Sequence, residues 1–196
     1  MLCKAAIPVN KIWLTSDHHF GHRNIIYYEQ RGFDSVKLMN EFMVYSWNKL
    51  VQPDDTVIHM GDFALCDKST ARSIFNSLNG TKYIIIGNHD RGPKGLKDIG
   101  FDTAEYWMQG VLLNSRKSLL FIHNIADAKD RIYDHIICGH VHSLWKTLGN
   151  AINVGVDIFD YKPVRLYDII PDIKQDDWLS LKMLVKTRNT PKFRIP

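Results

Sequence analysis

Five short apolar runs in this chain each stop at a cluster of Asp, Asn or His. They are KIWLTS, DTVIHM, TKYIII, SLLFI and DHIIC, which begin at residues 11, 55, 81, 118 and 134. Apolar and β-branched runs of this length, without strict alternation, are typical of strands that are buried on both faces. The chain must therefore fold so that several short strands are covered from both sides, with polar side chains just beyond one end of each.

Helical patterns separate some of these strands. Apolar residues recur at helical spacing over 38–50 and again over 71–78. Asp34 and Ser35 are candidate N-caps for the first helix; the second is expected to start near Ser69 or Thr70 and to end at an Asn-Gly pair, 79–80. Two more strands are expected within 150–158 and 164–170, while 178–186 fits either a strand or a helix. Alternating strands and helices predict an α/β layered fold.

Size and composition indicate one domain that spans 1–196. The 196 residues are 45% hydrophobic, with a basic tail from about 187 that we expect to be loose at its end. No segment resembles a signal peptide or a membrane span, and the three cysteines show no paired spacing, which predicts a cytoplasmic protein with no membrane partner. A net charge of +4 suits an anionic ligand such as a phosphate, and it is too small to indicate a nucleic-acid surface by itself.

The strand ends carry the side chains from which a metal site can be built. In open α/β sheets, ligands bind beyond the carboxyl ends of the strands. The five ends here present Asp17 with His19, Asp62, Asn88 with His89, His123, and His140 with His142. Carboxylate, amide and imidazole groups without a thiolate suit hard to borderline divalent cations.

The spacing of these residues supports the same interpretation. If 17–19 is extended, residues two apart point the same way, so Asp17 and His19 can hold one ion, as can His140 and His142. Glycines 61, 87 and 139 each precede a candidate ligand and allow the backbone to turn. Each motif alone has a simpler explanation, such as a turn for GNHD or a structural zinc site for GHVH. Five motifs in order, each just after a strand, predict a metal site.

The order DHH, GD, GNHD, H and GHVH resembles the calcineurin-like metallophosphoesterases, from residue 12 to about 163. The longer motifs SDHHFGHRNII, MGDFA and INVGVD resemble a small branch of bacterial and phage phosphoesterases. The resemblance implies a four-layer αββα sandwich with mixed sheets flanked by helices. It also implies two divalent metal ions, with Mn favoured among Mn, Fe, Zn, Ni and Co.

Carried over residue by residue, the resemblance implies ligands for two metals: Asp17, His19 and His142 for one, Asn88, His123 and His140 for the other, and Asp62 between them. His89 is implied to contact the transition state and to act as general acid. Asp90 is implied to orient His89.

These roles imply a metal-dependent phosphoesterase that hydrolyses a small phosphodiester, in preference to a monoester, by in-line attack of a hydroxide that bridges the metals. Two alternatives stay open. One is a nuclease that acts on RNA or DNA ends, and the other is an interaction protein that kept the fold without the chemistry. The second alternative is disfavoured because every expected ligand position is filled.

Four further residues have chemistry that the ligand set does not use. His22 and Arg23 come after the first ligands and are candidates for holding a substrate phosphate, with an ordinary surface loop as the alternative. His18 and His59 are expected to be packed, hydrogen-bonded histidines rather than ligands.

Overall fold

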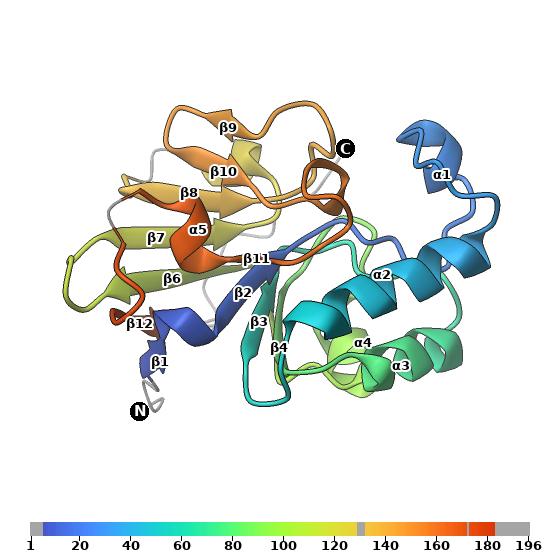
Figure 1. Cartoon of the computed structure of the whole chain (residues 1–196), viewed down its shortest axis with the longest axis horizontal. Coiled ribbons are helices and arrows are strands. Elements are labelled where there is room, and N and C mark those ends of the chain that lie inside the picture. The colour runs from blue at the N-terminus through green and yellow to red at the C-terminus, as the bar shows by residue number, and fades with distance from the viewer. Residues whose placement is uncertain (1–5, 129–131, 172, 183–196) are drawn as a thin grey trace.

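The strands form two mixed β-sheets that face each other, with helices on one outer face (Figure 1). The structure is a computed structural model that describes residues 6–128, 132–171 and 173–182. The five-stranded sheet has the order β11-β2-β3-β4-β5, formed by Val164–Arg165, Ile12–Thr15, Thr56–His59, Thr81–Ile85 and Thr103–Glu105. In it β2 to β5 run parallel, and β11 pairs antiparallel with β2.

The seven-stranded sheet mixes both orientations. Its order is β1-β12-β6-β7-β8-β10-β9, formed by Ala6–Pro8, Trp178–Lys182, Trp107–Leu112, Ser118–Ile122, His135–Cys138, Ala151–Asn153 and Thr147–Leu148. β7, β8 and β10 are parallel to one another, and the remaining neighbours are antiparallel. All five strands predicted from the apolar runs are present, three in one sheet and two in the other.

The central strands of the five-stranded sheet are buried on both faces. Along β3, Val57 belongs to the apolar cluster under the helices, and Ile58 belongs to the cluster between the two sheets. Ile84 and Ile85 divide in the same way along β4. This double cover explains why the runs show no polar alternation.

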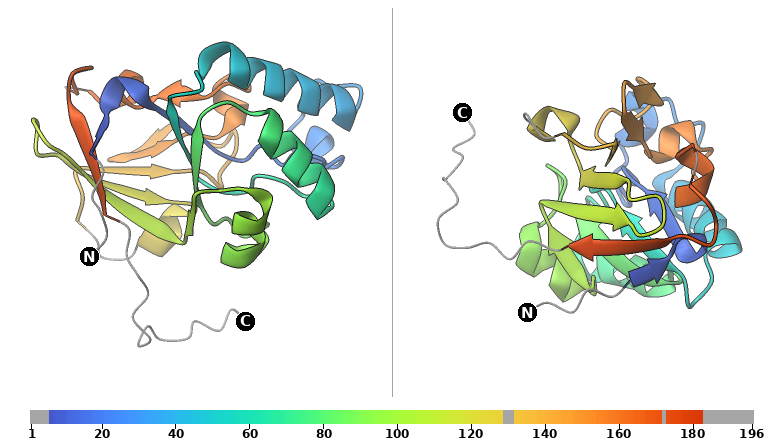
Figure 2. Two further views of the ribbon diagram at one scale, coloured as in Figure 1. Left: turned by 90° about the horizontal axis from the view of Figure 1, so that it is seen from below. Right: turned by 90° about the vertical axis from the view of Figure 1, so that its left-hand side faces the viewer.

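Three helices cover the outer face of the five-stranded sheet, namely α2 (Val36–Leu50), α3 (Lys68–Ser77) and α4 (Gly92–Ile99). Figure 2 shows them on one side of that sheet, with the seven-stranded sheet on the other. The remaining helices are short: α1 (Ile25–Tyr28), α5 (Leu166–Ile169), and the 3-10 turns η1 (Val9–Lys11), η2 (Ile125–Ala128) and η3 (Val156–Ile158). In the described part of the chain, η2 and loops cover the outer face of the seven-stranded sheet, where a small apolar cluster lies.

Helix starts depend on side-chain caps. The Ser35 hydroxyl accepts the Leu38 N–H at 3.2 Å, so the predicted cap of α2 is confirmed. Helix α3 begins earlier than the sequence predicted, because the Asp67 carboxylate accepts the Thr70 N–H at 2.9 Å and caps the helix two residues before Ser69.

The C-terminal part departs from expectation in one place. The strand expected over 164–170 is wrong for most of its length, because only β11 is extended and α5 comes next, with Leu166 and Ile170 buried between the sheets. The ambiguous segment from 178 is a strand through Lys182. The basic tail from about 187 lies outside the described residues. Among the described helices, none combines the length and the apolar character that a bilayer crossing requires.

Candidate metal centre

The predicted strand ends meet at one place, where the carboxyl ends of β2, β3 and β4 lie against those of β7 and β8. The Asp17 N–H donates to the Gly61 carbonyl at 3.0 Å, which joins the first two ends. The Gly139 N–H donates to the His123 carbonyl at 3.0 Å and joins the last two. The His140 N–H donates to Asp17 Oδ2 at 2.9 Å and so links one sheet to the other.

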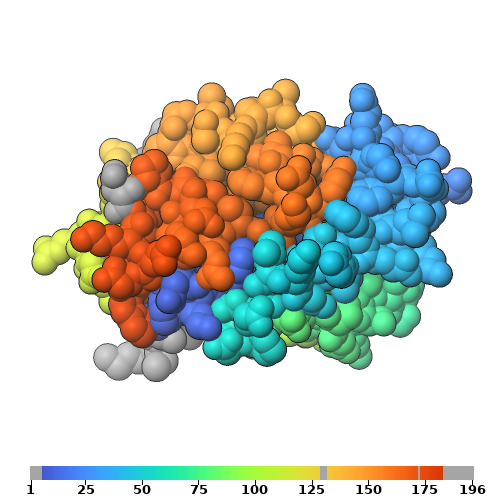
Figure 3. All heavy atoms as spheres, viewed as in Figure 1, coloured from blue at the N-terminus to red at the C-terminus, as the bar shows by residue number. Residues whose placement is uncertain are grey.

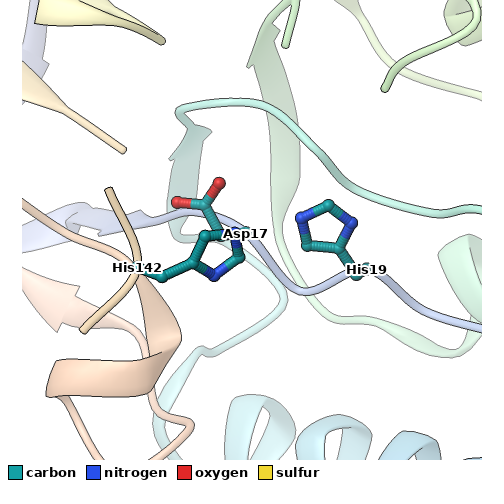
Figure 4. Close-up of side chains that lie close together, drawn as sticks. All are labelled: Asp17, His19 and His142. Carbon is teal, nitrogen blue, oxygen red and sulfur yellow. The ribbon is translucent and has the colours of Figure 1, made fainter. Parts of the chain in front are cut away.

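Asp17, His19 and His142 form the first group of ligand-type side chains (Figure 4). One donor atom from each lies within 4.8 Å of the other two. Among the described residues, Asp17 Oδ1 and both ring nitrogens of His19 are buried without a hydrogen-bond partner. Buried polar atoms are normally paired, so three orphans at one point fit a ligand set whose cation completes it.

The charges of this group also favour a bound cation. Burial raises the pKa of Asp17 to about 6, and burial also lowers the pKa of His19 to about 3. A carboxylate that is costly to ionise therefore lies beside an imidazole that does not take up a proton. A divalent cation would supply the positive charge that this pair lacks.

Asn88, His123 and His140 form a second group. His123 Nδ1 donates to the Met60 carbonyl at 2.7 Å, and its Nε2 lies 2.9 Å from Asn88 Oδ1. His140 Nδ1 lies 3.0 Å from the same oxygen. With the His123 proton on Nδ1, a neutral ring would place two acceptors against each other, which a second proton on His123, a turned Asn88 amide or a cation would relieve. Burial opposes a charge on His123, but the nearby carboxylates outweigh it and raise its pKa to about 9.

Asp62 lies between the two groups. Its Oδ2 is 3.5 Å from His19 Nε2 and 3.5 Å from His123 Nε2. Its Oδ1 accepts the His89 N–H at 2.9 Å. Burial works to raise the Asp62 pKa, but the contact with His123 and the bond from His89 hold it below the ordinary range. One carboxylate oxygen thus faces both groups while the other is held by the backbone.

The backbone at the candidate ligands is left-handed, which corrects the extended geometry assumed from the sequence. Five of them have positive φ, between 46° and 71°: Asp17, His19, Asp62, His140 and His142. Such conformations are uncommon outside glycine and gather at functional sites. The two-residue spacing therefore does not place both histidines of GHVH in one group, because His142 lies with Asp17 and His140 lies with Asn88.

Gly139 is required by a close approach between the two sheets. A Cβ on this residue would lie 2.0 Å from Ser16 Oγ and 2.5 Å from Asp17 Oδ2. Any side chain would therefore push the β2 end away from GHVH. Glycine is therefore needed here to let the backbone approach Ser16 and Asp17 closely, and not to form the sharp turn that the sequence predicted.

Asp90 occupies a different position from the one implied by the resemblance. Its carboxylate accepts three backbone N–H groups, from Asp62 at 2.8 Å, Phe63 at 3.0 Å and Gly87 at 2.9 Å. Both oxygens are thus used, and no hydrogen bond to the His89 ring is present among the described residues. Asp90 therefore fixes the loop that carries Asp62 rather than the tautomer of His89.

The remaining predicted site residues lie around the two groups. His89 is exposed, and its ring centroid is 5.4 Å from that of His19. The His22 ring centroid lies 5.7 Å from that of His19. Arg23 is exposed, next to His22. The rings of His89 and His22 thus both lie beside the candidate ligand His19.

His18 and His59 are packed histidines, as predicted. The Gly61 N–H donates to His59 Nδ1 at 3.1 Å, and His59 Nε2 lies 2.9 Å from His18 Nδ1. Burial lowers the pKa of both rings, so they form a neutral pair behind the centre.

Two charged residues that were not identified from the sequence form hydrogen bonds that hold the first group in place. Arg31 is fully buried and donates through Nε and Nη2 to the Asp157 carboxylate at 2.7 and 2.9 Å. It also donates to the carbonyls of Asp17, at 2.7 Å, and His18, at 2.8 Å. The Asp157 carboxylate accepts a hydrogen bond from His142 Nδ1 at 2.8 Å. This bond leaves His142 Nε2 as the ring nitrogen that can ligate a cation together with Asp17 and His19. Asp157 belongs to the INVGVD motif, whereas nothing near Arg31 signalled a role.

Comparison with known proteins finds relatives of similar length. No family model matches the chain. The uncharacterized protein MJ1445 of Methanocaldococcus jannaschii is 35% identical over 180 residues, which cover 86% of this chain and 94% of that protein. The Gene 66 protein of Mycobacterium phage L5 is 33% identical over 107 residues, 51% of this chain and 49% of that protein.

Two solved structures resemble this chain to different degrees. The crystal structure of a protein of unknown function, AQ665 from Aquifex aeolicus, has a TM-score of 0.62 and 29% identity, covering 78% of this chain and 94% of that chain. A structure described as a novel archaeal phosphodiesterase has a TM-score of 0.42 and 21% identity, covering 74% and 81%. The arrangement of the two sheets is thus shared with AQ665.

Proposed function

We propose that this chain, which belongs to the same family as the uncharacterized protein MJ1445 of Methanocaldococcus jannaschii, is a metal-dependent phosphoesterase that hydrolyses phosphodiesters. The observation that carries the proposal is the gathering of seven ligand-type side chains from five strand ends, with Asp62 in the middle and its Oδ2 facing both groups. We place the family among the calcineurin-like metallophosphoesterases, as a four-layer sandwich whose second helical layer is reduced to η2 and loops.

The two groups would hold two divalent cations. We assign one cation to Asp17, His19 and His142, and the other to Asn88, His123 and His140, with Asp62 shared. The orphaned atoms of the first group and the meeting of His123 and His140 at Asn88 Oδ1 support this division. Mn is the favoured ion, and Fe, Zn, Ni and Co share the ligand preference.

The cations, when bound, would supply Lewis-acid charge to the phosphoryl oxygens and lower the pKa of water to near neutrality. Hydrolysis forms a bond between phosphorus and a water oxygen, breaks the bond to the leaving oxygen, and releases an alcohol that has gained a proton. His89 lies at the rim of the centre and is the side chain that would hold this proton at the leaving oxygen. His22 and Arg23 would face the remaining phosphate oxygens.

Metal removal and replacement tests the proposal. The chain is stripped with a chelator and then supplied separately with Mn, Ni, Zn or Mg, and cleavage of bis-p-nitrophenyl phosphate is measured beside that of p-nitrophenyl phosphate. We expect no cleavage after stripping and metal-restored cleavage of the diester. Cleavage of the monoester alone would refute the diester preference. Failure on both substrates, with two metals bound per chain, would refute the proposed activity.

His89→Ala should separate metal binding from turnover. The His89 ring makes no hydrogen bond to the described residues, so its removal should leave metal content at the wild-type level. Loss of a positioned proton donor should lower kcat about a hundredfold to ten-thousandfold. Metal analysis and diester kinetics check both parts. A variant that keeps the wild-type rate would exclude His89 from the reaction.

A further inference from the structure

A series of aromatic rings leads from the candidate metal centre to the surface. The His22 ring centroid lies 5.7 Å from that of His19. The Tyr28 ring is next, 6.1 Å from His22 and inclined at 69° to it. Tyr28 is 68% exposed. Two ring-to-ring steps therefore connect a candidate ligand with an aromatic side chain that faces solvent.

The segment that carries Tyr28 is held in place on both sides. The Gly21 N–H donates to Asn40 Oδ1 of α2 at 3.1 Å. At the other end, Glu29 accepts the Ser143 hydroxyl at 3.1 Å, which ties α1 to the residue after the GHVH motif. Figure 3 shows this segment, in blue, at the outer surface at one end of the molecule. The Tyr28 ring is thus presented beside the centre.

The contact with His22 distinguishes Tyr28 from the other exposed aromatic residue of this segment. The neighbouring Tyr27 is as exposed as Tyr28, at 68%, so exposure alone does not distinguish the two. Tyr28 differs from Tyr27 in its contact with His22. The rings of Tyr28 and His22 thus meet edge to face beside the candidate ligand His19, and the Tyr28 ring is open to solvent.

We propose that Tyr28 and His22 receive the nucleobase of a nucleotide phosphodiester whose phosphate lies at the metal centre. This inference rests on the proposed function and narrows its substrate class. A flat base can place its face on one ring and its edge against the other, and these are the arrangements that aromatic groups prefer. The sugar of such a substrate would lie between the phosphate at the centre and the base on the rings. Stacking on aromatic side chains tolerates every base, so the two rings select the substrate class rather than one base.

Two esters with the same leaving group test this inference. Thymidine 5′-p-nitrophenyl phosphate carries the base, and tetrahydrofurfuryl p-nitrophenyl phosphate carries a similar ring without it. The readout is the ratio of their kcat/KM values within one variant, which cancels differences in folding and metal content. We expect the wild type to favour the thymidine ester, and Tyr28→Ala to lower the ratio about tenfold.

Variants at neighbouring positions make the result specific. Tyr27→Ala, at an equally exposed position, should keep the wild-type ratio, and Tyr28→Phe should keep it because the ring remains. A ratio near one in the wild type, or a ratio unchanged in Tyr28→Ala, would overturn the assignment while the phosphodiesterase activity stands. If the wild type with bound metals cleaves neither ester, the proposed function itself fails.

Discussion

Asp62→Asn is expected to lose metal and to lower diester hydrolysis by about a hundredfold or more. The Asp62 Oδ1 accepts the His89 N–H, and an amide oxygen in the variant would keep that bond. The amide NH₂ would then occupy the position of Oδ2, which faces both His19 and His123. A donor without charge cannot ligate a cation, so both groups would lose their shared oxygen at once.

The matched control is Asp54→Asn, because Asp54 is an exposed carboxylate whose side chain pairs with Lys11 at 2.8 Å, away from the centre. The Asp54→Asn variant also replaces a carboxylate with an amide, and it should retain wild-type metal content and activity. Metal is measured in the dialysed protein, and activity with bis-p-nitrophenyl phosphate. An Asp62→Asn variant that holds two metals and turns over at the wild-type rate would disprove the shared position.

The position of most candidate ligands could be predicted because each comes directly after an apolar run. Buried parallel strands bring the residues after their carboxyl ends to a common edge, so Asp62 and Asn88 were placed near each other from the order of the motifs alone. The sequence could not show that the ends come from two sheets. It also could not show that Asp17 and His19 adopt left-handed backbone, since that conformation depends on the contact of the β2 end with Gly139.

Contacts between residues far apart in sequence were beyond prediction. Arg31 and Asp157 are separated by 126 residues, and an isolated arginine in a loop normally indicates solvent exposure. The role of Asp90 was misassigned for a related reason. A neighbour in the motif GNHD was taken as its side-chain partner, whereas its carboxylate accepts backbone N–H groups, one from Gly87 of the same motif and two from the loop of Asp62 and Phe63. Local motifs identify side chains with chemistry, and the packing of the sheets decides which of them meet.

Arg31→Met is expected to be strongly destabilising, by about 3 to 5 kcal/mol in the free energy of unfolding. Methionine fills much of the same volume but removes every donor. The buried Asp157 carboxylate would lose two hydrogen bonds, and the carbonyls of Asp17 and His18 would lose one each. The buried carboxylate would keep the bond from His142 Nδ1 but lose its guanidinium partner, and this is costly because no water replaces the lost donors.

Urea unfolding in the presence of chelator measures this effect without the contribution of bound metal. Lys68→Met is the control, because Lys68 pairs with Asp98 at 2.7 Å between side chains that are 48% and 41% exposed. The stability lost in Lys68→Met should be far smaller, since solvent screens both charges.

The double variant Arg31→Met with Asp157→Leu should recover part of the stability, because it also removes the buried carboxylate that has lost Arg31. A single Arg31→Met variant as stable as Lys68→Met would show that the buried ion pair does not hold the loops behind the metal centre. The expected recovery in the double variant would show that part of the cost lies in the Asp157 carboxylate that has lost Arg31.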